Sequence, residues 1–105
     1  MEIVETSVFT RHIGRLLSED EYRELQYRLV INPFAGVVIR GSGGLRKLRW
    51  AAEGRGKSGR IRVIYYYVTT EHRIFMLVAY GKGAKGDLTD SEVAALRKLV
   101  KEELS

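Results

Sequence analysis

The spacing of apolar and polar positions predicts one strand and one helix in the first third of the chain. Residues 2–10 alternate loosely and are typical of a strand, whereas residues 11–17 have an ambiguous pattern that also fits a helical turn. Residues 18–21, Ser-Glu-Asp-Glu, have the order of a capping box, which marks a helix start. Residues 32–33, Asn-Pro, end this helix because proline cannot continue one. The apolar face of the helix consists of Tyr22, Leu25 and Leu29.

Strand patterns dominate the centre of the chain. Residues 37–39 suggest a short extended piece, and residues 45–51 alternate between apolar and basic positions. Residues 60–70 and 73–80 are rich in β-branched and aromatic side chains and flank a short turn, so we expect them to pair as a central hairpin. Because both runs are apolar at nearly every position, burial on both faces of these strands is expected.

A second helix closes the chain. Thr89 and Glu92 have the spacing of another capping box, and apolar positions follow at helical spacing. The order of elements predicts an α+β fold, with helices packed on one face of a small, twisted, mostly antiparallel sheet. The chain has no internal repeat and no dividing linker, so residues 1–105 are expected to form a single domain. The apolar positions of this helix are Val93, Leu96, Val100 and Leu104.

Positive charge is concentrated in the middle of the chain. The formal net charge is +5, but residues 1–35 carry −2, residues 36–86 carry +9 and residues 87–105 carry −2. This distribution favours a polyanionic partner, nucleic acid first, although a solvated basic face on another enzyme has the same charge. The absence of cysteine excludes disulfides, thiol nucleophiles and cysteine-based zinc sites. No secretory segment or membrane-spanning run is visible, so a cytoplasmic location without membrane contact is expected.

The glycine-rich segment 51–58, AAEGRGKS, fits only the loosest form of a nucleotide-binding P-loop. Such a loop requires a helix directly after it, because the N–H groups at the helix start hold the phosphates. Residues 60–68 are instead typical of a strand, and no Walker B candidate is evident. The segment is therefore interpreted as a basic loop between two strands rather than as a nucleotide site.

Conventional catalytic groups are scarce. His12 and His72 have no partner at ligand spacing and are interpreted as exposed titratable residues. Glu53 and Glu71 are the only carboxylates within residues 36–86, too few for a two-metal nuclease. RNA needs no metal for cleavage, however, because its 2′-OH can attack the adjacent phosphorus if an enzyme aligns it, neutralises charge and moves a proton. Arginine suits charge neutralisation, and a lysine or tyrosine among other cations suits proton transfer.

Three cations are predicted to share one face of the sheet. Lys47 and Arg49 alternate with Leu48 and Trp50, and Arg62 lies in the following strand, so the three can project to the same side. The alternative for each is a solvated or merely phosphate-positioning role. The adjoining loops contribute Lys57 and Lys82. Further candidates for RNA binding in this region are Arg46, Arg55, Arg60 and Lys85.

Three runs of the sequence form a recognisable set. They are GGLRKLRWA at residues 43–51, GRGKSGRIRVIYYY at residues 54–67 and IFMLVAYGK at residues 74–82. Together they resemble the RelE/ParE superfamily of type II toxins, and the HigB branch most of all. The resemblance covers nearly the whole chain and implies a RelE-like toxin fold. It also implies a toxin that enters the ribosomal A site and cleaves mRNA without a metal ion or cofactor, which arrests translation. A cognate helix-turn-helix antitoxin similar to HigA would neutralise it, in a higher oligomer.

The resemblance also implies roles for individual residues. By position, Lys47 and Arg49 correspond to the cationic pair that holds the RNA backbone, and Arg62 corresponds to the catalytic arginine at the scissile phosphate. Residues 81–82 match the glycine-lysine after the last strand, but Gly83 stands where RelE-type members have an arginine. No residue after Tyr80 is aromatic, so nothing matches the C-terminal tyrosine that serves RelE as general base. The candidates for proton transfer are therefore Lys57, Tyr80, Lys82 and Lys85.

Two non-enzymatic functions are the alternatives. The ParE branch shares the fold but poisons DNA gyrase without cleaving RNA, so fold does not decide activity. A small basic nucleic-acid-binding module is the other. The absence of an indisputable general base supports both, and codon-phased breaks in mRNA would separate them from a nuclease.

Overall fold

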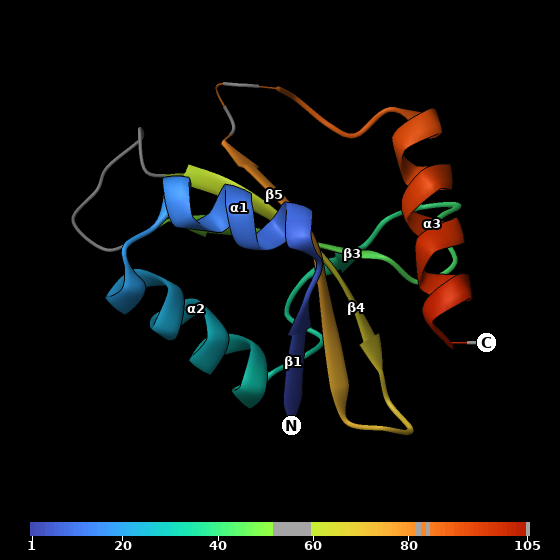
Figure 1. The fold of residues 1–105 in the computed structure, drawn as a ribbon. Helices are drawn as coiled ribbons and strands as arrows, with labels where there is room; N and C mark the ends of the chain where they lie inside the picture. Colours follow the sequence, from blue (N-terminus) through green and yellow to red (C-terminus); the bar gives the residue numbers. More distant parts are fainter. Residues whose placement is uncertain (52–59, 82, 84, 105) are drawn as a thin grey trace.

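The computed structural model of the chain describes residues 1–51, 60–81, 83 and 85–104. Within them, five strands form one sheet in the order β1-β5-β4-β3-β2, flanked by three helices (Figure 1). Only β1 and β5 pair in parallel, so the predicted α+β class and mostly antiparallel sheet are confirmed. The elements are β1 (Glu2–Glu5), α1 (Ser7–Leu16), α2 (Glu19–Ile31), β2 (Val37–Val38), β3 (Arg46–Ala51), β4 (Arg60–Val68), β5 (Arg73–Gly81) and α3 (Asp90–Leu104).

The first strand is shorter than predicted, because a helix begins inside the segment 2–10. Thr6 caps α1: its hydroxyl accepts a hydrogen bond from the Phe9 N–H at 3.0 Å and donates one to the Leu77 carbonyl at 2.7 Å. Phe9 is fully buried as part of the inner face of α1. The apolar residues that suggested a longer strand therefore belong to a helix, and the ambiguous residues that follow continue it.

The two predicted capping boxes are confirmed. At the start of α2, the Ser18 hydroxyl accepts the Glu21 N–H at 3.2 Å, and the Glu21 carboxylate accepts the Ser18 N–H at 2.7 Å. Thr89 and Glu92 exchange the same two bonds before α3, at 3.1 and 2.9 Å. Each box satisfies backbone N–H groups that a helix start leaves without partners. None of the described helices is long and apolar enough to cross a bilayer.

Helices cover both faces of the sheet, which corrects the prediction that they pack on one face. α1 and α2 lie on one side and α3 lies on the other (Figure 1). In β4, Ile61, Val63 and Tyr65 join the core beneath α1 and α2, whereas Ile64 and Val68 join the core beneath α3. The expected burial of the central hairpin on both faces is thus confirmed. A strand that is apolar on both faces needs cover on both, and α3 provides the second layer.

Tyr65 ties the loop after α2 to the sheet. Its side chain is fully buried, and its hydroxyl donates to the Pro33 carbonyl at 2.7 Å and accepts from the Gly36 N–H at 2.8 Å. Burial raises the pKa of this phenol. Gly36 lies so close to the ring that a Cβ added there would be 2.8 Å from a ring carbon. One aromatic side chain therefore holds the loop that leads into β2, and its hydroxyl both donates and accepts a hydrogen bond.

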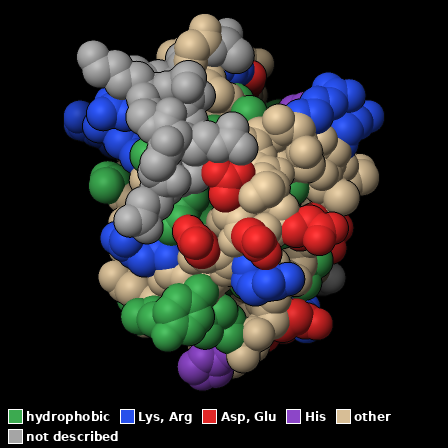
Figure 2. All heavy atoms as spheres, turned by 90° about the vertical axis from the view of Figure 1, so that its left-hand side faces the viewer, with side chains coloured by type: hydrophobic (Ala, Val, Ile, Leu, Met, Phe, Trp, Pro, Cys, Tyr) green, Lys and Arg blue, Asp and Glu red, His purple; other side chains and the backbone are tan. Residues whose placement is uncertain are grey.

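The face of the molecule that α1 and α2 cover is acidic in its middle, as Figure 2 shows. The first turn of α2 contains Glu19, Asp20 and Glu21, whose negative charges interact favourably with the positive end of the helix dipole. An acidic face does not suit a polyanion, so a nucleic-acid interface is expected on the side of the sheet where α3 packs.

Candidate nucleic-acid interface

Side chains from three strands lie in one row on the α3 side of the sheet. Arg49 of β3 is paired in register with Arg62 of β4, and Arg62 is paired with Tyr80 of β5. Trp50 packs against the core on the opposite face. Because neighbours in a strand point to opposite faces, Lys47 and Arg49 project with Arg62 toward the α3 side, as the alternation predicted. Lys47, Arg49, Arg62 and Tyr80 are called the cationic face below.

Three arginines line a shallow hollow at one end of the cationic face. Arg49, Arg60 and Arg62 enclose it with Trp50 and Ala51, and its volume is about 160 Å³. Within the described part of the chain, none of these arginines forms an ion pair with a carboxylate. Arginine side chains without acidic partners can each give two parallel hydrogen bonds to phosphate oxygens. The hollow therefore has the chemistry of a phosphate site.

Lys47, in contrast, already has an anionic partner. Its ammonium nitrogen lies 2.7 Å from a carboxylate oxygen of Asp87, in the segment that leads into α3. The Lys47 side chain is 21% exposed and that of Asp87 is 79% exposed. The hydrogen bond and the charge of Lys47 lower the pKa of the Asp87 carboxyl, with smaller contributions from Arg49 and Arg62. Asp87 thus lies within the positive field of the cationic face.

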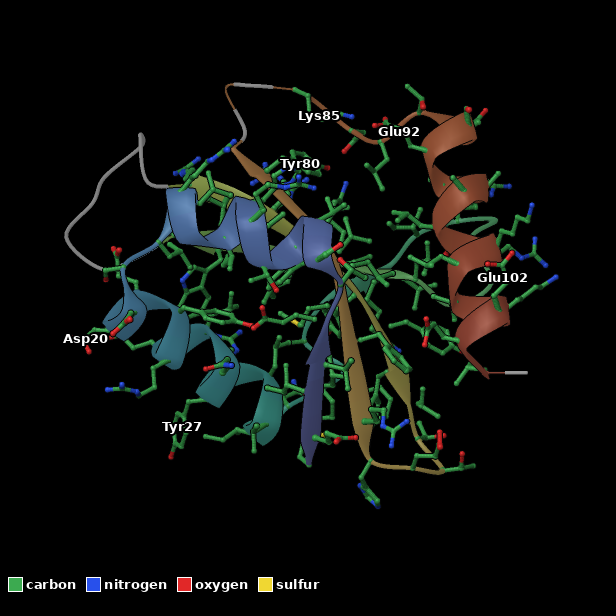
Figure 3. The ribbon with its side chains drawn as sticks, viewed as in Figure 1. Asp20, Tyr27, Tyr80, Lys85, Glu92 and Glu102 are labelled. Carbon is green, nitrogen blue, oxygen red and sulfur yellow. The ribbon has the colours of Figure 1, made fainter. Side chains whose placement is uncertain are left out.

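Lys85 is held between Glu92 and Tyr80. Its ammonium forms an ion pair with the Glu92 carboxylate and lies 5.7 Å from the centre of the Tyr80 ring. Figure 3 shows Lys85 and Glu92 facing each other between the end of β5 and the start of α3. The hydrogen bond from Lys85, followed by the one from the Thr89 N–H, lowers the pKa of the Glu92 carboxyl. One carboxylate therefore caps α3 and neutralises a lysine beside the cationic face.

The Tyr80 hydroxyl is buried and has no hydrogen-bond partner among the described residues. Burial raises the pKa of this phenol above its usual value, the nearby Asp87 charge raises it further, and Arg62 lowers it in part. The phenol is therefore protonated at neutral pH and can act as a proton donor. A buried polar atom without a partner is uncommon in folded proteins, and a catalytic role is one explanation for it.

His12, which the sequence suggested to be an exposed titratable residue, also belongs to this region. It lies in α1 rather than in a turn, it is half-buried, and it lines a pocket of about 240 Å³ together with Tyr80, Lys85 and Glu92. β1 pairs only with the first part of β5, and α1 packs along β5, which brings His12 to the edge of the strand near Tyr80. No spacing along the chain signals this contact, because it joins elements far apart in sequence.

A larger hollow of about 770 Å³ extends the positive surface between residues 37–41 and α3. It shares Lys47 and Asp87 with the region just described. Its walls add four cations that the sequence pattern did not single out, one from the turn before β3 and three from α3. They are Arg40, Arg97, Lys98 and Lys101.

Among the remaining predicted residues that the structure describes, Arg46 is not brought to the cationic face. Arg46 is one residue away from Lys47 and so projects to the opposite side of β3, where it donates to the Gly36 carbonyl at 2.8 Å and lies 5.0 Å from the centre of the Phe34 ring. In the described ranges, no three His, Cys, Asp or Glu side chains are placed to hold a metal ion. Outside the described residues lie Arg55, Lys57 and Lys82.

Comparison with known proteins gives one family and one fold. Residues 39–105 match the model of the family described as the RelE toxin of the RelE/RelB toxin–antitoxin system. A free-state E. coli RelE toxin with two arginine-to-alanine substitutions aligns over 90% of each chain, with a TM-score of 0.53 and 17% identity. The isolated E. coli RelE toxin aligns over 93% of this chain and 97% of its own, with a TM-score of 0.55 and 14% identity. These structures confirm the predicted RelE-like fold, and the finer assignment to the HigB branch stays a prediction.

Proposed function

This chain belongs to the RelE family of toxins from toxin–antitoxin systems, and we propose that it is an endoribonuclease that cleaves mRNA on the ribosome without a metal ion. The observation that carries the proposal is the row of Arg49, Arg62 and Tyr80 across three strands, which ends in a hollow lined by Arg60. This row combines groups that bind a phosphate with a group that can donate a proton. Those are the requirements for cleavage by the 2′-OH of RNA.

Arg62 occupies the centre of the proposed site. In the reaction, the 2′-oxygen bonds to phosphorus, the bond from phosphorus to the 5′-oxygen breaks, and negative charge builds on the other phosphate oxygens. Arg62 and its register partner Arg49 would donate hydrogen bonds to these oxygens, and Arg60 adds positive charge to the same hollow. Arginine stays charged at any working pH, so this stabilisation needs no proton transfer.

Two groups would move the protons. Tyr80 would serve as the general acid that protonates the departing 5′-oxygen, because its phenol, with a pKa raised by burial, carries its proton at neutral pH. His12 lines the same pocket and suits the base that accepts the proton of the 2′-OH, because histidine is the side chain used most often as a general base. Lys57 and Lys82, which lie outside the described residues, are the other candidates for the base. The Tyr80 hydroxyl is buried, so the bound RNA must expose it.

The proposed partners follow from charge and family. Lys47, Lys85 and the cations of the larger hollow would hold the mRNA backbone on either side of the cleaved bond. Membership in the family implies an antitoxin as partner. A HigA-like helix-turn-helix antitoxin, a complex larger than one-to-one, and binding in the ribosomal A site are parts of the proposal.

The proposal is tested by induced expression followed by primer extension on a cellular mRNA. The wild-type chain should produce codon-phased breaks, and Arg62→Gln should not. Arg23→Gln, which removes the same charge from the exposed face of α2, is the matched control and should cleave like the wild type. Cleavage products from programmed ribosomes should end in a 2′,3′-cyclic phosphate, and a 2′-deoxy nucleotide at the cleaved position should abolish the break.

The same experiments would also reveal a non-enzymatic function. Growth arrest with intact mRNA and damaged DNA indicates a gyrase poison of the ParE type. Breaks that persist when the 2′-OH is absent contradict the proposed chemistry, even if the chain proves to be a nuclease. Equal cleavage by Arg62→Gln and the wild type contradicts the assignment of the site.

A further inference from the structure

The lysines and arginines of the candidate interface differ in their partners. Lys47 and Lys85 each form an ion pair with a carboxylate of the same chain, Asp87 and Glu92 respectively. The arginines of the hollow form no such pair within the residues the structure describes. Both carboxylates come from the short stretch 87–92, which follows β5 and opens α3. One local segment therefore supplies two anions to the surface that is proposed to bind RNA.

The Asp87 carboxylate contacts Lys47 in the way that a phosphate oxygen also could. Its oxygen is 2.7 Å from the Lys47 nitrogen, the distance of a charge-assisted hydrogen bond to a carboxylate or a phosphate. Lys47 is mostly shielded from solvent, so it has little room for a second anion while Asp87 is in place. Asp87 itself is largely exposed, and its removal from Lys47 would leave its carboxylate in water rather than buried.

Glu92 has the same relation to the other lysine. It pairs with Lys85, whose ammonium lies over the ring of Tyr80. Glu92 also accepts the Thr89 N–H in the capping box, so its backbone position is fixed by α3 whether or not Lys85 remains bound. If Lys85 turned toward an RNA phosphate, Glu92 would keep its role as a cap, and the pocket around Tyr80 would lose one of its walls.

On the basis of the proposed function, we infer that Asp87 and Glu92 occupy two phosphate positions, at Lys47 and Lys85, and that substrate RNA displaces both carboxylates when it binds. The free protein then holds an internal substitute for its substrate. RNA binding must then break two ion pairs, which lowers its net binding free energy, whereas no carboxylate among the described residues pairs with the arginines of the hollow. Displacement of Lys85 from its present place also links RNA binding to access to the Tyr80 hydroxyl.

The test measures the affinity for a single-stranded RNA with 2′-O-methyl groups, which cannot be cleaved, by fluorescence anisotropy. Asp87→Asn removes the competing charge while keeping the size of the side chain, and should raise the affinity about two- to five-fold, the range expected for breaking an exposed ion pair. Asp90→Asn is the matched control: it removes the same charge three residues away in the wall of the same hollow, and Asp90 has no ion pair within the described residues. The gain should exceed that of the control.

Dependence on the lysine makes the test specific. In a Lys47→Gln background, Asp87→Asn should give no gain beyond that of Asp90→Asn, because no pair remains to be broken. Glu92→Gln should raise the affinity in the same way through Lys85. Because glutamine can keep the capping box, this variant gives an independent result if Asp87→Asn does not fold. Thermal unfolding of each variant checks that it is folded.

The possible outcomes separate this inference from the proposed function. Equal affinities of Asp87→Asn and Asp90→Asn, or a loss of affinity in Asp87→Asn, overturn the inference; a loss would mean that Asp87 positions Lys47 for binding. If Lys47→Gln and Arg62→Gln weaken binding while the acidic variants change nothing, the RNA interface stands without the internal competitor. If none of these variants changes RNA binding or cleavage, the proposed function itself fails.

Discussion

The two faces of the sheet differ in how far their apolar surface extends. Beneath α1 and α2, inward side chains of β3, β4 and β5 form a core that runs along the strands, from Leu48 and Ile61 to Ile74. Beneath α3, the apolar part includes Phe75 and Leu77. Toward one end of that same face the strands instead carry the cationic face, with its row of Arg49, Arg62 and Tyr80.

The difference indicates that one strand can hold core residues on one face and candidate functional residues on the other. In β4, Ile61 is 2% exposed on one face, and its neighbour Arg62 points to the other. Because the side-chain period of a strand is two, a charge on one face leaves the packing of the opposite face intact. Substitutions in the central strands should therefore have effects that depend on which face a residue occupies, rather than on its position along the chain.

The largest effect is expected for Arg62→Gln. The single-turnover rate of mRNA cleavage on programmed ribosomes should fall about 10²–10³-fold, because a donor to the developing phosphate charge is lost. The free energy of unfolding in urea should change by less than about 0.5 kcal/mol, because no core contact is removed. A large loss of stability without a loss of rate would reverse the assignment of the two faces.

The neighbouring variant Ile61→Ala should show the opposite behaviour. Loss of a buried side chain beneath the first two helices should lower the free energy of unfolding by about 2–5 kcal/mol. Measured at a temperature where the variant is folded, its cleavage rate should match that of the wild type. The milder Ile61→Val, expected to cost about 0.5–1.5 kcal/mol, provides a graded control. A cleavage defect in both variants would show that the faces are coupled.

Gly36→Ala tests the close contact between Gly36 and the ring of Tyr65. The new methyl group would lie 2.8 Å from a ring carbon of Tyr65, so the ring or the loop must move and the hydroxyl bonds weaken. A loss of about 1–3 kcal/mol in urea unfolding is expected. Gly14→Ala is the matched control, because Gly14 lies in α1 with open space around its Cβ position. That variant should gain about 0.5–1 kcal/mol from helix propensity.

The smallest effect concerns the pH dependence of the Lys47–Asp87 pair. Lys47 lowers the pKa of Asp87 in the folded state, so the pair stabilises the fold above the unfolded value of about 3.8, and this stabilisation is lost as pH falls through the lowered pKa. Thermal midpoints of the wild type and Asp87→Asn should therefore differ slightly at neutral pH and converge below pH 3.8. A difference that persists in strong acid would require a contact of Asp87 other than its charge.

Local signals in the sequence predicted most of the elements. The capping boxes at Ser18 and Thr89 and the stop at residues 32–33 depend on neighbours within a few residues, and all three are confirmed. Alternation in β3 and β4 placed Lys47, Arg49 and Arg62 on one face for the same reason. The start of α1 was missed, because its capping contacts include a carbonyl of β5 that is distant in sequence.

The partners of the candidate site could not be predicted in this way. Lys47 and Asp87 are 40 residues apart, and nothing in their local sequence indicates that they meet. His12 reaches the pocket of Tyr80 only because α1 packs along β5. The apolar pattern of the central strands did indicate two buried faces, yet which helix covers which face depends on the path of the chain between elements.

By itself, the sequence determined most of the elements, the face on which each residue of the central strands lies and the concentration of positive charge, because these depend on the chain over a few residues. Only the tertiary structure decided that residues 87–92 place two carboxylates on the lysines beside the row of Arg49, Arg62 and Tyr80, because this depends on how distant segments pack. The candidate site therefore depends on how the sheet and α3 pack together, whereas its cationic residues are already on one face of the strands.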